Sequence, residues 1–197
     1  MLASDPHTTI DSFQSTINGL QSTINTLTDE QQLYDLIQDY AYYHDLCFGQ
    51  AAGPTHDTAW EALFTADAMT SLYPIGTHHG SQGKMTWAQS YIGGRGQGCQ
   101  LTLSNTRVIL KEHDTISAMG RAYGHSEVIA DDALKSFSIK GRYEFSFRKV
   151  DRVWKIACME LWVITTLHMS RAPDSSLFTS VPFPDPVDIE NRLKPKL

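Results

Sequence analysis

The chain has 197 residues, of which 41% are hydrophobic and 19% are charged, and its formal net charge is -6 at neutral pH. This length suffices for one domain with a complete core but not for two of ordinary size. Lys and Arg are scattered along an acidic chain, which argues against binding to the phosphate backbone of nucleic acids.

Cysteine usage and hydropathy indicate the compartment. Cys47, Cys99 and Cys158 lie far apart in apolar stretches, which favours buried reduced thiols over a disulfide framework or a metal site. No stretch reaches the ~20 apolar residues of a membrane helix, and the first thirty residues contain no apolar signal-peptide core. We therefore expect a cytoplasmic protein with no membrane contact and no bound metal.

The first element along the chain is an internal repeat, QSTINGL followed by QSTINTL, over residues 14–27. With the residues before it, the repeat spaces apolar side chains at alternating steps of three and four: Ile10, Phe13, Ile17, Leu20, Ile24 and Leu27. This is the a/d pattern of a coiled coil, here over fewer than three full heptads. Residues 1–28 are thus predicted to form an amphipathic helix that lies on its own domain or pairs with a second subunit.

A second helix is predicted from about Asp29 to Phe48, because Thr28 and Gln31 have the spacing of a capping box and apolar residues follow at helical intervals. The apolar stripe of this helix continues into His44, with Asp45 at its edge. A short helix over 60–64, a strand over 68–76 and a helix over 83–92 are predicted next.

The rest of the chain is predicted to be sheet, with strands over about 100–110, 115–129, 136–149 and 153–166. Turns at Asp131-Asp132 and at Asp151 join them as antiparallel hairpins. Helices followed by such a meander predict an α+β domain over residues 29–170, a curved antiparallel sheet closed by helices. The Pro-rich residues 171–197 are expected to form an extended tail.

Three sequence features carry a resemblance to a known family. They are Trp-x-x-Leu-Phe-x-x-Asp-Ala from Trp60 to Ala68, the pair Gly76 and Gly80, and Asp-x-Val-Trp-Lys-Ile from Asp151 to Ile156. In this order, over residues 29–166, they resemble the SnoaL-like, scytalone dehydratase-like branch of the nuclear transport factor 2-like superfamily. The resemblance implies a cone-shaped α+β barrel with a cavity for a small hydrophobic molecule, no cofactor, and pairing of two subunits through the sheet.

The resemblance also implies site residues. The Tyr-Asp pair at the end of the family's long helix falls on His44 and Asp45, and a Tyr of the first strand falls on Tyr73. One of the family's two catalytic histidines falls within one residue of His125.

Two positions depart from the family. The second histidine would fall near Leu101, where this chain has none, and an Asn of the next strand is replaced by Tyr143. Scytalone itself is therefore not implied as the substrate.

On chemical grounds Asp45 and His125 form the predicted dyad, because a carboxylate can orient an imidazole and stabilise its protonated form. His125 would move a proton beside a carbonyl, Tyr73 or Tyr143 would donate to the oxyanion, and His44 would be a second proton carrier. A satisfied structural role for either histidine stays open. Predicted substrate contacts are Tyr143, Trp162, Met119, Phe145, Asn105 and Arg121.

The predicted function is that of a cofactor-independent lyase, cyclase or isomerase acting on a small hydrophobic intermediate of polyketide or terpenoid origin, in secondary metabolism. Two alternatives remain: a non-catalytic module that binds a small molecule or a protein, and an epoxide hydrolase in which an Asp and an Arg position water. An enzyme of the predicted kind should bring Asp45 and His125 together in a deep pocket, whereas a binding module should bury them or point them apart. A homodimer is predicted in either case.

Overall fold

The computed structural model describes residues 6–49, 53–91, 96, 98–111, 114–129 and 135–170. The predicted turn at Asp131-Asp132 and the Pro-rich segment 171–197 lie outside these residues. The elements are, in chain order, α1 (Pro6–Phe48), α2 (Pro54–Glu61), β1 (Phe64–Tyr73), β2 (Gly76–His79), α3 (Lys84–Ser90), β3 (Gly98–Leu110), β4 (Ser117–Ile129), β5 (Lys135–Val150) and β6 (Val153–Ser170). None of the described helices has a stretch long and apolar enough to span a membrane.

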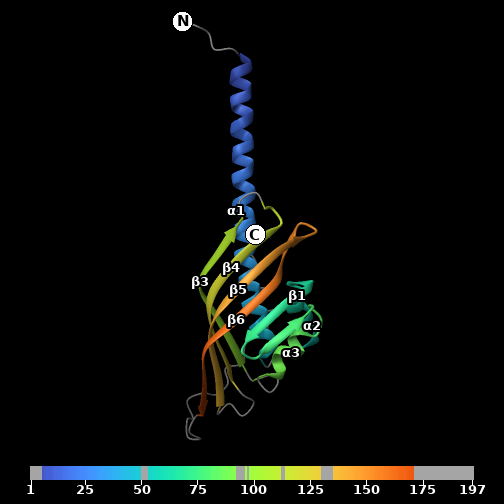
Figure 1. Ribbon diagram of the computed structural model, residues 1–197, viewed down its shortest axis with the longest axis vertical. Coiled ribbons are helices and arrows are strands. Elements are labelled where there is room, and N and C mark those ends of the chain that lie inside the picture. The colour runs from blue at the N-terminus through green and yellow to red at the C-terminus, as the bar shows by residue number, and fades with distance from the viewer. Residues whose placement is uncertain are drawn as a thin grey trace, which may run out of the picture.

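The six strands form one curved sheet in the order β2-β1-β6-β5-β4-β3 (Figure 1). The α+β class and the curved sheet are confirmed. Among the described strands the sheet stays open, with β2 and β3 at its edges, rather than closing into a barrel. One pair also differs from the antiparallel expectation, because β1 runs parallel to β6 while the other neighbours are antiparallel. Strand β2 lies between the strand predicted over 68–76 and the helix predicted over 83–92, where no strand was predicted.

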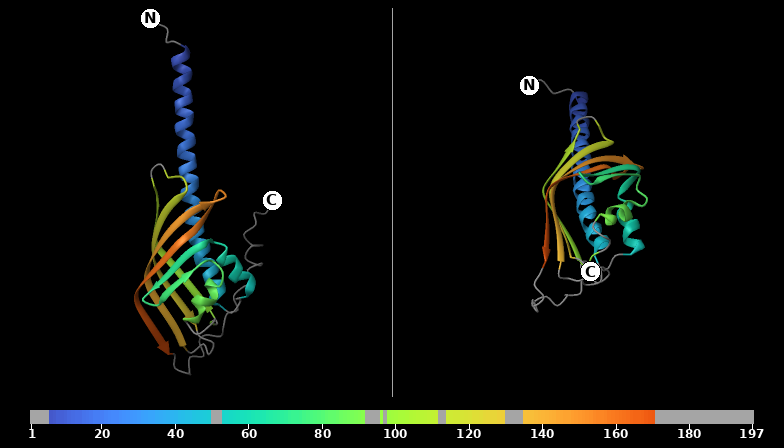
Figure 2. Two further views of the ribbon diagram at one scale, coloured as in Figure 1. Left: turned by 45° about the vertical axis from the view of Figure 1, so that its right-hand side comes forward. Right: turned by 60° about the horizontal axis from the view of Figure 1, so that its bottom comes forward.

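Helix α1 is one continuous helix of 43 residues rather than two. The predicted helix start at Asp29 is wrong, since Thr28 lies inside α1. Asp29 instead ties the helix to the sheet: its Oδ1 accepts hydrogen bonds from Lys149 Nζ at 2.6 Å and Trp154 Nε1 at 3.0 Å. Beyond this point α1 lies in the hollow of the sheet, whereas its N-terminal part projects away from the domain (Figure 2).

The two faces of the sheet carry side chains of different size along β4. Gly120, Ala122, Gly124 and Ser126 are buried, and the residues between them are mostly exposed. A Cβ atom at Gly124 would lie 2.2 Å from Cε2 of Tyr143, so only glycine leaves room for that ring. The small residues of β4 therefore face the concave side, where the aromatic rings of β5 pack against α1.

Candidate active site

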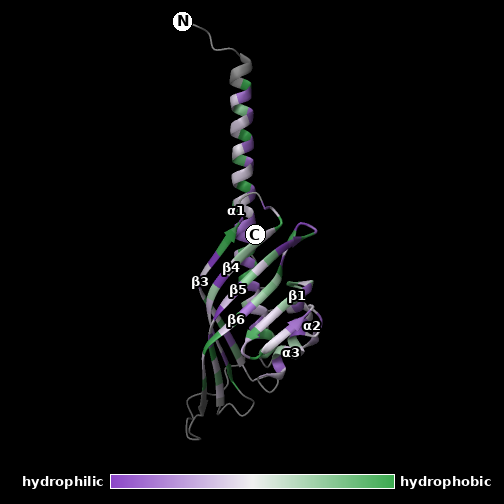
Figure 3. Cartoon of the chain, viewed as in Figure 1, coloured by the Kyte–Doolittle hydropathy of each residue, from purple (hydrophilic) through white to green (hydrophobic). Residues whose placement is uncertain are grey.

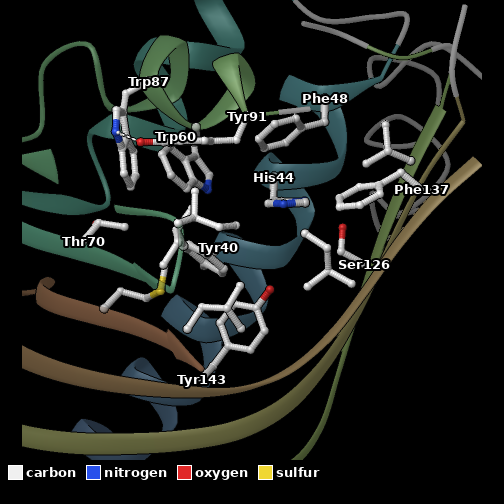
Figure 4. A pocket seen from close by; sticks show the side chains of 17 residues that line it. Tyr40, His44, Phe48, Trp60, Thr70, Trp87, Tyr91, Ser126, Phe137 and Tyr143 are labelled. Carbon is white, nitrogen blue, oxygen red and sulfur yellow. Dashed lines mark hydrogen bonds between the residues drawn. The ribbon is translucent and has the colours of Figure 1, made fainter. Parts of the chain in front are cut away.

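A pocket lies between α1, the concave face of the sheet, α2 and α3 (Figure 4). Its volume is about 80 Å³. Most of the wall is aliphatic or aromatic, with a few polar groups among them: Tyr40, His44, Phe48, Trp60, Thr70, Leu72, Ile75, Trp87, Ala88, Tyr91, Ser126, Val128, Phe137, Ile139, Tyr143, Met159 and Leu161. An apolar pocket with a small number of placed polar groups is the usual form of a small-molecule site.

His44 is the imidazole of this pocket. It lies between Tyr40 and Phe48, one helical turn before and after it, with ring centroids at 6.2 Å and 4.5 Å, because residues four apart share one face of a helix. The side chain is only 12% exposed. Packing on both sides thus holds the ring in one orientation within the pocket wall.

Asp45 follows His44 and fixes one side of its ring. Oδ1 of Asp45 lies 3.4 Å from Nδ1 of His44 and accepts the backbone N–H of Leu101 at 2.6 Å. The resemblance placed the family's second histidine, which this chain lacks, near Leu101. The structure brings Leu101 beside Asp45. In this chain the imidazole next to Asp45 is supplied by His44, from the same helix.

Cys99 completes this cluster. Its Sγ lies 3.6 Å from Nδ1 of His44 and 3.9 Å from Oγ of Ser126, a residue of the pocket wall. Burial, followed by the nearby Asp45 carboxylate, raises the pKa of the Cys99 thiol well above its ordinary value. Cys99 therefore stays a protonated thiol at neutral pH and is a hydrogen-bond partner rather than a nucleophile.

His44, Asp45 and Cys99 also form the cluster of possible metal ligands in the described part of the chain, with ligand atoms within 4.8 Å of one another. A thiol coordinates metal as the thiolate, which the raised pKa of Cys99 disfavours. Asp45 already accepts a backbone hydrogen bond. The chemistry of the three groups fits a proton-transfer network better than a metal centre.

Two buried phenols lie near the imidazole. Burial raises the pKa of both Tyr40 and Tyr143, and the charges of neighbouring acidic groups act in the same direction. Both hydroxyls therefore remain protonated at neutral pH. The hydroxyl of Tyr143 points toward the middle of the pocket (Figure 4), where a protonated phenol can donate a hydrogen bond to a ligand oxygen.

A buried lysine supports the opposite wall. Nζ of Lys84, the first residue of α3, donates a hydrogen bond to Oγ1 of Thr70 at 2.6 Å and lies 4.6 Å from the ring centroid of Phe64. Burial lowers the pKa of Lys84 to about 8, although the nearby Cys158 and Glu61 act against this shift. The Thr70 hydroxyl accepts from Lys84 and keeps its own O–H as a hydrogen-bond donor, and Thr70 lines the pocket.

The indole of Trp60 provides a further donor. Its ring is 2% exposed, and its Nε1 is buried with no hydrogen-bond partner among the described residues. Figure 4 shows the nitrogen turned toward the interior of the pocket. A buried N–H without an acceptor is costly. An oxygen atom of a bound molecule would remove that cost.

The predicted dyad of Asp45 and His125 does not form. His125 is exposed on the convex face of the sheet, and its Nε2 lies 2.8 Å from Oγ of Ser138. Its neighbours Gly124 and Ser126 face inward instead. Since a shift of one residue moves every side chain of a strand to the other face, the one-residue offset in the family match is sufficient to explain this correction.

Four other predicted residues also lie outside the pocket on exposed parts of the sheet. Tyr73 stacks on Trp162 at 4.2 Å and donates to Oε1 of Glu160 at 3.3 Å, while Arg121 and Met119 share the exposed side of β4 with His125. The predicted donor role of Tyr73 and the predicted substrate contacts of Trp162, Arg121 and Met119 are therefore wrong for this pocket.

The last two predicted substrate contacts, Asn105 and Phe145, also lie outside the pocket lining. Asn105 is exposed at an irregularity of β3, with a φ of 51°. Phe145 is 1% exposed and packs 5.6 Å from Tyr40 in the core, without lining the pocket. Of the predicted site residues, the structure therefore brings together His44, Asp45 and Tyr143.

The pocket residues that the sequence analysis missed include Trp60, Thr70 and Trp87, with Lys84 behind them. Trp60 belongs to a motif that was used only to identify the family. Thr70 and Lys84 are fourteen positions apart, and their contact depends on how α3 folds back over β1. No local pattern signals such a contact, although Lys84 is the one charged residue of α3.

Comparisons with known proteins agree with this architecture. Residues 25–160 match the family model of the SnoaL-like domain, and the chain belongs to this family. No curated protein matches the chain.

Solved structures share the fold. A protein of Novosphingobium aromaticivorans provisionally named a scytalone dehydratase aligns with a TM-score of 0.61 and 20% identity, covering 77% of this chain and 97% of its own. The hexachlorocyclohexane dehydrochlorinase LinA-type3 of Novosphingobium barchaimii aligns with a TM-score of 0.58 and 15% identity, covering 75% and 94%. An NTF2-like protein with a cystatin-like fold, also from Novosphingobium aromaticivorans, gives 0.57 and 15%, covering 75% and 89%.

Proposed function

We propose that the protein is a cofactor-independent lyase or isomerase in which His44 moves a proton to or from a small hydrophobic carbonyl compound. The observation that carries this proposal is the position of a packed imidazole, flanked by a carboxylate, in the wall of an apolar pocket. Two similar folds belong to proteins named for eliminations, a dehydratase and a dehydrochlorinase, which supports the class of reaction.

The polar groups of the pocket favour a ligand with a carbonyl oxygen. Trp60 offers an unpaired N–H, Thr70 an O–H freed by Lys84, and Tyr143 a protonated phenol. All three are donors, and donors stabilise the negative charge that develops on a carbonyl oxygen when a proton leaves the neighbouring carbon. A ligand with an acceptor oxygen would satisfy the indole as well as any charge formed in the reaction.

The proposed proton path starts at the carbon next to that carbonyl. Nδ1 of His44 faces Asp45 and Cys99, so a ligand in the pocket would meet Nε2. Nε2 takes the proton, and Asp45 stabilises the resulting imidazolium. The proton then returns to a leaving hydroxyl, which departs as water, or to another carbon, which gives an isomer.

The size of the pocket limits the ligand. About 80 Å³ is smaller than the roughly 150 Å³ that holds a benzene ring in an engineered cavity, so a one-ring compound would extend toward the mouth. An origin in polyketide or terpenoid metabolism, and cyclisation as the reaction, stay predictions.

The test uses two one-ring probes with the intact chain. Cyclohexanone in deuterated water reports proton exchange next to the carbonyl by NMR, and 3-hydroxycyclohexanone reports loss of water by the absorbance of the enone. We expect catalysis of at least one of these reactions, and its loss in His44→Gln, which keeps a polar side chain but cannot carry the proton. Quenching of tryptophan fluorescence measures binding separately, because Trp60 and Trp87 line the pocket.

A non-catalytic binding role is the second candidate, and one observation favours it. Asp45 and His125 point apart, as expected of a binding module. Binding of cyclohexanone without exchange or dehydration above the rate in buffer would support this alternative and contradict the proposed enzyme. Epoxide hydrolysis has less support, since Arg121 faces away from the pocket and no arginine is among the described residues that line it.

A further inference from the structure

The N-terminal part of α1 leaves a large apolar stripe uncovered. Each of its six apolar residues is between 55% and 65% exposed: Ile10, Phe13, Ile17, Leu20, Ile24 and Leu27. Figure 3 shows these hydrophobic positions recurring along the projecting part of the helix. We define residues 6–28 as the stalk; it extends about 35 Å. Such an exposed apolar stripe marks an interaction surface.

The stalk is a poor helix by itself. Between residues 6 and 28 the sequence is rich in Ser, Thr and Asn and has Gly19 near its middle. Asp11 is the one acidic residue in this stretch, which contains no Lys or Arg. Ser, Thr, Asn and Gly are weak helix formers, and no opposite charges stand four residues apart to support the turns. A helix of this composition requires packing against another surface.

The stripe faces away from the domain that carries it. At about 100° per residue, the centre of the stripe lies roughly 160° around the helix from the buried residues of its C-terminal half. Those buried residues are Leu33, Leu36, Ile37, Tyr40, Ala41, Cys47 and Phe48. A partner helix can therefore lie along the stripe while each domain remains on the outside.

We propose that two copies of this chain pair through their stalks as a parallel two-stranded coiled coil. The identity of the seam residues selects this arrangement, because Ile10, Ile17 and Ile24 occupy the a positions and leucine occupies two of the three d positions. Isoleucine at a with leucine at d favours two parallel strands over three or four.

The flanks of the seam fit a second copy of the same sequence. The e and g positions carry the uncharged Gln14, Thr16, Gln21 and Thr23, so two identical stalks bring no like charges together. Gln14 and Gln21 each donate to the Asn four residues later, Asn18 at 3.1 Å and Asn25 at 3.0 Å, so both repeats present the same surface.

The pairing should end near Gln31. The exposed side of α1 then carries Asp35 and Asp39, whose counterparts in a second copy would repel them.

The repeat supplies a matched pair of variants for the test in the full chain. Ile17→Lys with Ile24→Lys puts two charges into the seam, whereas Asn18→Lys with Asn25→Lys puts the same charges on the b positions next to it. Sedimentation equilibrium at about 10 μM should give a mass of two chains for the unaltered protein and for the Asn variant. The Ile variant should dissociate and lose helical circular dichroism.

Cysteine cross-linking reports the direction of pairing even if the domains also associate. In a parallel coil Ile10→Cys lies opposite its own copy and should oxidise to a disulfide-linked dimer, while Ser15→Cys, on the outer side, should not. The unaltered chain, whose Cys47 and Cys99 are buried and whose Cys158 is half-buried, is the background control for cross-links that do not involve the stalk. In an antiparallel coil, residue 10 of one chain would lie opposite residue 27 of the other. A mixture of Ile10→Cys chains and Leu27→Cys chains would then cross-link to each other.

A mass of two chains together with the Ile10→Cys cross-link supports the proposal, and loss of that cross-link when the two lysines are added to the seam supports it further. A single-chain mass for the unaltered protein, a mass of three chains, or the Ile10-to-Leu27 cross-link would each overturn it.

Discussion

The concave and convex faces of the sheet both carry aromatic and titratable side chains, yet their surroundings differ. On the concave side His44 is packed between two rings and contacts Asp45 and Cys99, and the hydroxyls of Thr70 and Tyr143 line the same pocket. On the convex side His125 and the stacked pair of Tyr73 and Trp162 are exposed. Water screens charge and competes for hydrogen bonds on that side, so proton transfer should depend on the concave face.

The largest expected difference separates the two histidines. His44→Gln should lower turnover of the one-ring ketone probes by roughly 10²-fold or more, because it removes the group that carries the proton. His125→Gln, which keeps the size and polarity of an exposed residue, should stay within about twofold. Initial rates with matched far-ultraviolet circular dichroism test this comparison. A large loss in His125→Gln, with His44→Gln unaffected, would contradict the assignment of the two faces.

The next comparison concerns neighbours on β4. Gly124→Ala places a methyl group against the ring of Tyr143, where a Cβ would lie 2.2 Å from one ring carbon, so the ring or the strand must move. Overpacking of this kind costs about 1–3 kcal/mol of unfolding free energy. His125→Gln, one residue later on the exposed side, keeps a side chain that can hydrogen-bond to Ser138 and should change the stability by less than about 0.5 kcal/mol. Urea unfolding of both variants measures the difference, and equal stabilities would show that β4 does not distinguish the faces as described.

These two residues also show why the fold could be predicted but much of the site could not. The strand and helix patterns of the domain repeat many times along the chain, and an error of one or two residues at an end leaves each element intact. The direction of a side chain on β4 depends on a single residue of register, and the family match near His125 was uncertain by that amount. The alternation of Gly120, Ala122, Gly124 and Ser126 was the available signal for the inward face.

His44 was correctly placed on the apolar stripe of its helix, because a helical stripe averages over several turns. The contact between Thr70 and Lys84 had no local pattern to predict it. The break predicted at Thr28 was wrong because a capping-box spacing also occurs inside a continuous helix.

The third comparison tests the donor groups of the pocket. Thr70→Val removes the hydroxyl that Lys84 supports while keeping the shape of the side chain, and should lower turnover about tenfold, which corresponds to about 1.4 kcal/mol. Thr70→Ser keeps the hydroxyl and should recover most of the rate. Tyr73→Phe removes a hydroxyl from the outer face and should have no measurable effect. Equal rates for Thr70→Val and Thr70→Ser would exclude the hydroxyl from the reaction.

The smallest effect concerns the pH dependence of stability set by Lys84. Its pKa is about 8 in the folded protein, lowered by burial from the ordinary 10.5, while Glu61 and Cys158 oppose the shift. Between these two values the unfolded chain binds more protons than the folded one, so the free energy of unfolding should rise with pH above about 8, by about 1 kcal/mol between pH 8 and pH 9. Below pH 8 both states hold the proton, and this dependence fades.

Lys84→Met removes the titrating group and should flatten the rise, whereas Lys140→Met, which removes an exposed lysine from the convex face, should leave it unchanged. Urea unfolding at pH 7, 8 and 9 measures the three slopes side by side. The same slope in Lys84→Met as in the unaltered chain would show that this lysine is not desolvated on folding, and the concave side would then lack the buried charge that distinguishes it from the convex side.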